Sequence, residues 1–119
     1  MSHDSILLNK SLHFAAKIVK LYQVLTKQKK ETIIAKQLIR SATSIGANAN
    51  EAVFGVSKAD FVAKLQIALK ECYETEYWLK LFVKSDILNR DTAIDLYHQC
   101  GTIRRILIAS INTAKGSTK

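Results

Sequence analysis

Residue types that support catalysis are present in this chain, but their spacing does not bring them together. His3, His13 and His98 are scattered through the sequence and form no metal-ligand pattern. Metal sites in helical bundles use Glu-x-x-His pairs, and the sequence contains none. It also lacks a phosphate-binding glycine loop and a Ser/His/Asp set that could converge. We therefore expect a protein that is not an enzyme and that has no cofactor and no metal.

The strongest polar constellation is Arg40 with Glu71 and Glu74. If the turn between the two helices that carry them centres near Val56, antiparallel packing places residue 40 beside residue 72. Arg40 could then bridge the two carboxylates, which repel each other at this spacing unless a cation lies between them. Three interpretations stay open: an intrachain structural ion pair, a polar network that crosses a subunit boundary, and a ligand or catalytic site.

A half-buried polar row is expected to continue from Arg40 along the same helix. It comprises Ser44, Asn48 and Glu51, which follow at spacings of four, four and three residues. The row borders a line of mostly small apolar residues with helical spacing: Ala35, Leu38, Ala42, Ile45, Ala49 and Ala52. Small side chains let another backbone approach, so the simplest interpretation is a close helix crossing with satisfied polar groups.

Positive charge is concentrated in one part of the chain. The formal net charge is +8, and residues 10–40 hold eight lysines and arginines but only one acid, Glu31. Such a field attracts polyanions, although lysine-rich helix faces can also serve solubility alone. The candidate phosphate contacts are Lys10, Lys17, Lys20, Lys27, Lys29, Lys30 and Lys36. Without an RNA-binding motif that exposes stacking aromatics, we expect binding to the backbone of RNA or DNA rather than recognition of bases.

Long helices must position these groups. The chain has no proline, four glycines and 48% hydrophobic residues, which favours uninterrupted helices. Periodic apolar lines predict helices over about residues 5–26, 31–54, 58–84 and 90–114, with Asp4 or Ser5 capping the first and Ser57 the third. Gly55 stands where a C-terminal cap is expected, and Gly46 suggests a close contact within the second helix. The predicted fold is all-α: one antiparallel up-down-up-down four-helix bundle over residues 1–119, with a frayed tail over 115–119.

The helices carry more apolar lines than one small bundle needs. The first helix has two, through Leu7, Ser11, Phe14, Ile18, Leu21 and Leu25, and through Leu8, Leu12, Ala15, Val19 and Tyr22. The third helix has a second line that includes Ile67, Trp78 and Leu81. A surplus of this kind indicates a generous core or an oligomer interface. A docking surface for another protein on the Ile67–Leu81 face is the alternative function.

The two cysteines and the first residues of the chain indicate the cellular compartment of the protein. Cys72 and Cys100 fall on core lines of neighbouring helices, where we expect buried free thiols rather than a disulfide. Met1–Ser5 contains no charged leader followed by an apolar segment, and no window is long and apolar enough to cross a membrane. A cytoplasmic protein without membrane contact is the expectation.

Two stretches of this sequence resemble a known family. The pattern Arg40-x-x-x-Ser44-Ile45-x-x-Asn48-x-x-Glu51, together with the run from Phe61 to Leu79, is similar to the bacterial four-helix-bundle proteins encoded in 23S rRNA intervening sequences. The chain departs from that family at residues 49–52, where an Ile-Ala-Glu-Gly ending is common. The resemblance implies an all-α homo-oligomer, a pentamer by preference, without established catalytic activity. The chain is also similar to the accessory proteins of diversity-generating retroelements, which implies that nucleic acid and a nucleic-acid-processing protein are partners.

Overall fold

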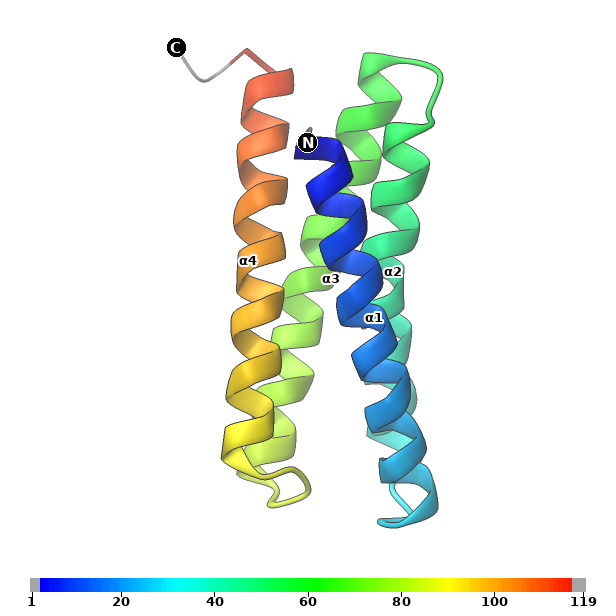
Figure 1. Cartoon of the computed structure of the whole chain (residues 1–119), viewed down its shortest axis with the longest axis vertical. Coiled ribbons are helices and arrows are strands. Elements are labelled where there is room, and N and C mark those ends of the chain that lie inside the picture. Colours follow the sequence, from blue (N-terminus) through cyan, green and yellow to red (C-terminus); the bar gives the residue numbers. More distant parts are fainter. Residues whose placement is uncertain (1–2, 117–119) are drawn as a thin grey trace.

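Four helices make up the computed structural model, which describes residues 3–116 (Figure 1). They are α1 (His3–Lys27), α2 (Ile33–Val53), α3 (Lys58–Lys84) and α4 (Arg90–Ala114). The predicted all-α fold is confirmed, with the bounds of α3 and α4 as expected. Helix α1 begins earlier than predicted, so Asp4 lies within its first turn and is not its N-cap. Residues 117–119 of the predicted tail lie outside the described part.

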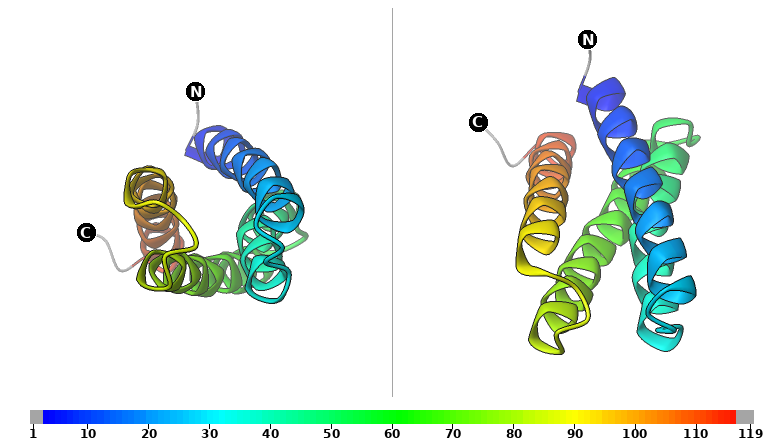
Figure 2. Two further views of the ribbon diagram at one scale, coloured as in Figure 1. Left: turned by 90° about the horizontal axis from the view of Figure 1, so that it is seen from below. Right: turned by 60° about the horizontal axis from the view of Figure 1, so that its bottom comes forward.

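The helices alternate in direction and form an elongated bundle of 46 × 25 × 24 Å. Residues 28–32 and 85–89 form turns at one end, which we call the two-turn end, and residues 54–57 form the turn at the other (Figure 1). Each helix packs against the next in sequence, whereas α1 and α4 make the smallest contact of the neighbouring pairs. Seen along the bundle, α1 runs obliquely past α2, and the ring of helices opens between α1 and α4 (Figure 2).

The predicted core lines of α2, α3 and α4 are buried, and so is one line of α1. Their buried residues form a single cluster that runs the length of the bundle. The second apolar line of α1 is buried only in part, because Leu8 and Tyr22 pack against the core whereas Leu12 is 72% exposed and Val19 is also exposed. As a core position the prediction is wrong for Leu12 and Val19. Within the described residues α1 contacts α2 and α4, and its Phe14 and Ile18 side chains are buried. No described element covers Leu12 and Val19, so this flank of α1 is an apolar surface.

Local capping explains where the helices begin. Ser57 Oγ accepts a hydrogen bond from the Asp60 amide, and Asn89 Oδ1 accepts one from the Thr92 amide. Helix α2 is capped differently: Thr32 makes no side-chain cap, and the Glu31 carboxylate accepts hydrogen bonds from the amides of residues 34 and 35. An acidic group at this position also interacts favourably with the helix dipole.

Two glycines stand where an added Cβ would be crowded. A Cβ at Gly46 would lie 3.3 Å from Ser11 Oγ, which confirms the predicted close crossing of α1 and α2. Gly55 does not adopt the left-handed conformation of a helix C-cap, so that part of the prediction is wrong. A Cβ there would lie 3.2 Å from the backbone carbonyl oxygens of Glu51 and Ala52 and would also meet the Asp60 carboxylate, so a side chain at this position would be crowded.

Candidate nucleic-acid interface and polar network

The candidate phosphate contacts spread over α1, the turn that follows it and the first turn of α2. Lys10 and Lys17 line a cleft of about 190 Å³ between α1 and α4, together with His13, Gln99 and Thr102. Lys17 Nζ lies 3.9 Å from an Asp95 carboxylate oxygen. The remaining candidates are exposed and have no carboxylate within ion-pair distance among the described residues: Lys20, Lys27, Lys29, Lys30 and Lys36.

The single acid of this basic segment does not neutralise its lysines. Glu31 is occupied by the two backbone amides at the start of α2. Lys30, its neighbour, takes a left-handed conformation with φ 58°, which helps to reverse the chain between α1 and α2. The positive charge of the turn therefore faces solvent without an acidic partner in the described structure.

The fold adds cations that sequence analysis did not include. Because the first and third turns share one end of the bundle, Lys29 and Arg90 line the same surface depression of about 480 Å³. Lys84 lies at the end of α3, close to the third turn. The predicted up-down-up-down topology could have identified this group of cations, because it places the first and third turns at the same end of the bundle.

Arg40 bridges Glu71 and Glu74 within one chain, as the antiparallel register predicts. Its guanidinium Nη1 lies 3.5 Å from Glu71 Oε2, and its Nη2 donates to Glu74 Oε2. The indole N–H of Trp78 donates to the same Glu74 oxygen at 3.0 Å. The Arg40 side chain is 49% exposed, so the bridge belongs to the surface between α2 and α3. The pKa of Glu74 is lowered, first by the Arg40 hydrogen bond and further by Trp78.

The rest of the predicted polar row does not join this bridge. Asn48 Nδ2 donates to the backbone carbonyl of Ser44, within its own helix. Glu51 pairs with Lys64 of α3 at 3.0 Å, on the exposed surface. The predicted row is therefore a series of separate contacts along α2.

Replacing Arg40 with alanine should lower the free energy of unfolding at neutral pH by about 1 kcal/mol, the scale of an exposed ion pair. Because the pKa of Glu74 is lower in the folded than in the unfolded protein, its carboxylate stabilises the fold at pH values above the unfolded pKa. This stabilisation is lost as the pH falls through the folded pKa. The difference between wild type and variant should therefore shrink when urea unfolding is repeated near pH 3. A difference that does not change with pH would contradict a role for the carboxylates.

The predicted interface residues of α3 differ in exposure. Ile67 is exposed, whereas Trp78 and Leu81 are half-buried. Trp78 packs against the core, and Tyr77 meets its ring edge-on with centroids 5.0 Å apart. The large apolar side chains that α3 exposes are therefore Ile67, Tyr73 and Tyr77.

A second ion pair, between Glu76 and Arg104, is more deeply buried and was not predicted. Arg104 Nε donates to Glu76 Oε2 at 2.9 Å, and the Glu76 side chain is only 8% exposed. The guanidinium also lies over the Tyr73 ring at 5.8 Å from its centroid. The hydrogen bond with Glu76 raises the pKa of Arg104. Glu76 follows Cys72 by four residues and precedes Leu79 by three, which is the spacing of core positions. This spacing could have indicated that Glu76 is buried.

The interior between α3 and α4 also contains the two cysteines. Both are buried and free, as predicted, and Cys100 Sγ lies 3.6 Å from the Cys72 carbonyl oxygen. Hydrogen bonding with Cys72 and burial raise the pKa of the Cys100 thiol. On the other side of α3, Thr75 Oγ1 donates to Ser41 Oγ at 2.9 Å in the core. These polar atoms thus have partners within the bundle.

These features define a class of protein: a small basic four-helix bundle with surface and buried ion pairs between its helices. Among the described residues, no three His, Cys, Asp or Glu side chains lie close enough to hold a metal ion. Nor does any helix there contain a stretch apolar and long enough to span a membrane.

Comparison with known proteins identifies the family. The family model of the 23S rRNA-intervening sequence protein matches residues 3–109. The chain belongs to this family, which confirms that part of the resemblance. A crystal structure of a protein of unknown function from the S23 ribosomal protein family of Bacteroides thetaiotaomicron is 43% identical, with a TM-score of 0.92. The similarity covers 93% of this chain and 99% of that chain. No curated protein matches, and the likeness to retroelement accessory proteins stays a prediction.

Proposed function

We propose that the protein is a non-enzymatic homo-oligomer that binds nucleic acid, with RNA preferred, through the phosphate backbone. The observation that carries the proposal is the group of exposed lysines around the first turn, which have no acidic partner among the described residues. Lys27 and Lys29 flank that turn, Lys20 lies further back on α1, and Arg90 of α4 adds charge at the same end.

Phosphate contacts explain why such an arrangement would bind without reading sequence. Lysine ammonium groups attract phosphates as point charges and release the counterions condensed on the nucleic acid. In a homo-oligomer the same group of lysines repeats once per subunit, which multiplies the contacts. The family resemblance favours a pentamer, and the uncovered apolar flank around Leu12 supports self-association.

Changing Lys20, Lys27 and Lys29 together to glutamine should weaken RNA binding by about tenfold or more at low salt. The slope of log K against log salt should become shallower by about 2, because three single-strand phosphate contacts are removed. Fluorescence anisotropy with a short labelled single-stranded RNA, titrated at several salt concentrations, measures both quantities.

The matched control changes Lys58, Lys70 and Lys115 to glutamine. These lysines are also exposed and have no ion pair within the described residues, but they lie away from the two-turn end. Both triple variants lose three positive charges, so a difference in their RNA affinity shows that the position of the lysines matters. Equal weakening by the two variants, or no binding by the wild type at low salt, would contradict the proposal.

A further inference from the structure

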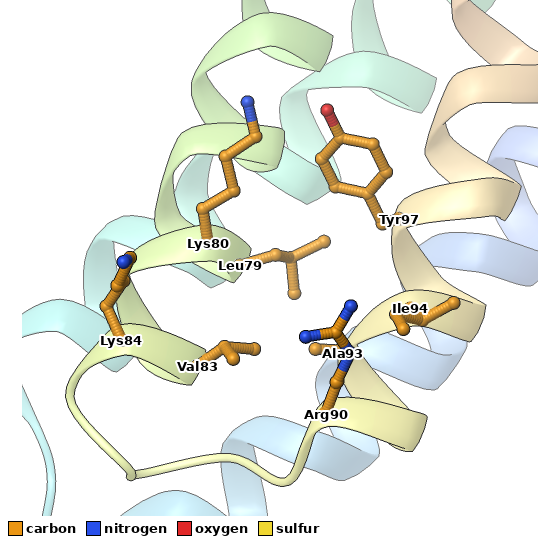
Figure 3. Close-up of a pocket in the computed structure, with 8 residues that line it drawn as sticks. All are labelled: Leu79, Lys80, Val83, Lys84, Arg90, Ala93, Ile94 and Tyr97. Carbon is orange, nitrogen blue, oxygen red and sulfur yellow. The ribbon is translucent and has the colours of Figure 1, made fainter.

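An apolar groove runs between the end of α3 and the beginning of α4, beside the cations of the two-turn end. Its volume is about 270 Å³. Its floor comes from both helices and consists of apolar side chains and one tyrosine (Figure 3): Leu79, Val83, Ala93, Ile94 and Tyr97. Ile94 is 38% exposed, whereas Leu79 and Ala93 are buried. The groove therefore offers apolar surface to solvent above a packed base.

The rim of this groove is entirely cationic. Lys80 and Lys84 lie one turn apart on α3, and Arg90 faces them from α4 (Figure 3). Lys80 Nζ is held 5.5 Å from the centroid of the Tyr97 ring. Within the described residues none of the three has a carboxylate at ion-pair distance, and Glu76, one turn before Lys80, pairs with Arg104 instead. The groove thus combines an apolar floor with unneutralised positive charge on both walls.

The groove continues around the two-turn end. Val83 and Arg90 also line the neighbouring depression of about 480 Å³, which reaches Leu21 and Val24 of α1. An occupant could therefore extend from the α3–α4 face to the end of α1, with Lys29 at the far side. Asp86 is the one acid that lines this second part.

We propose that this groove docks an acidic peptide segment of a partner protein, with its apolar side chains on the floor and its carboxylates against Lys80, Lys84 and Arg90. A small molecule fits less well, because ligand sites bury most of their ligand and this groove is open along its length. A nucleic acid would satisfy the cations but leaves the apolar floor unused. An amphipathic acidic helix meets both features, since helix-in-groove recognition uses apolar anchors one turn apart.

The probe is a labelled synthetic helical peptide rich in glutamate, with leucines one turn apart on one face. It should bind, and binding should weaken with salt and shift the methyl NMR signals of Ile94, Val83 and Leu79 in the wild-type protein. Two companion peptides test the two halves of the proposal: one carries serine for each leucine, and one carries lysine for each glutamate. Both should bind at least about tenfold more weakly, the effect of losing one good apolar or charged contact.

Variants then locate the site on the protein. Ile94→Ser, and separately the pair Lys84→Gln with Arg90→Gln, should each weaken binding of the leucine–glutamate peptide by about tenfold. The controls are Ile67→Ser and Lys70→Gln, which lie on α3 but do not line the groove. They should leave binding unchanged, with circular dichroism confirming the fold. The proposal would be overturned if the serine peptide bound as well as the leucine peptide, since binding would then depend on charge alone. It would also be overturned by methyl shifts outside the groove, or by no binding at millimolar peptide.

Discussion

Replacing Arg104 with alanine should lower the free energy of unfolding by about 3 kcal/mol, because removal of one partner leaves a buried charge unpaired. The Glu76 side chain is 8% exposed, and the only hydrogen bond to its carboxylate in the described structure comes from Arg104 Nε. The variant also loses the contact of the guanidinium with the Tyr73 ring. Arg40→Ala, in contrast, removes a partner that is half exposed, and should cost less.

Urea unfolding at one fixed protein concentration measures this difference, since oligomer stability depends on concentration. Arg105→Ala is the matched control, because Arg105 is exposed and donates only to Thr102 Oγ1 in the described structure. It should cost no more than about 0.5 kcal/mol. A double variant with leucine at positions 76 and 104 should recover most of the loss, because an apolar pair can replace a buried ion pair. Equal effects of Arg104→Ala and Arg105→Ala would show that the buried pair does not stabilise the fold.

The sequence predicts α2, α3 and α4 well because each has one dominant apolar line that the bundle buries. Helix α1 shows the limit of this reasoning. Its two apolar lines are equally regular in the sequence, and only the tertiary arrangement decides that Phe14 faces the core while Leu12 faces solvent. Helix α1 packs mainly on α2 and makes only a small contact with α4, so the described structure leaves much of its second line uncovered. Periodicity therefore identifies apolar faces, but it does not identify what covers them.

The contacts between helices were predictable where the register alone determines them. Arg40 meets Glu71 and Glu74 because α2 and α3 run uninterrupted from a short turn, so one turn position fixes every pairing. The burial of Glu76 was not predicted, because the side chain of a charged residue at a core position can point to solvent unless a cation from another helix pairs with it. Whether Arg104 does so depends on the rotation of α4, which sequence spacing does not give. Asn48 was assigned to a network, but an amide side chain can instead bond a carbonyl of its own helix.

Replacing Leu12 with aspartate should dissociate the proposed oligomer. Leu12 is 72% exposed and borders a groove of about 430 Å³ between α1 and α2, whose α2 side is made by Gly46, Ala47 and other small residues. A closed ring with five subunits needs two different complementary surfaces on each chain. The Leu12 flank and the surface around Ile67 are two such apolar surfaces, on the two helices that pack against α2. Burying Leu12 would contribute about 1.5–3 kcal/mol at every interface, whereas a buried unpaired aspartate opposes association.

Light scattering at micromolar concentration should give the wild type a mass several times 13.3 kDa, close to fivefold for the pentamer, and the Leu12→Asp variant a mass near that of one chain. Phe54→Asp is the matched control, because Phe54 is 73% exposed but lies at the turn between α2 and α3. It should keep the wild-type mass. If Phe54→Asp dissociates the oligomer and Leu12→Asp does not, the interface lies at that turn. A monomeric wild type would remove the oligomer from the proposed function, and with it the repeated lysine groups on which strong binding to the phosphate backbone depends.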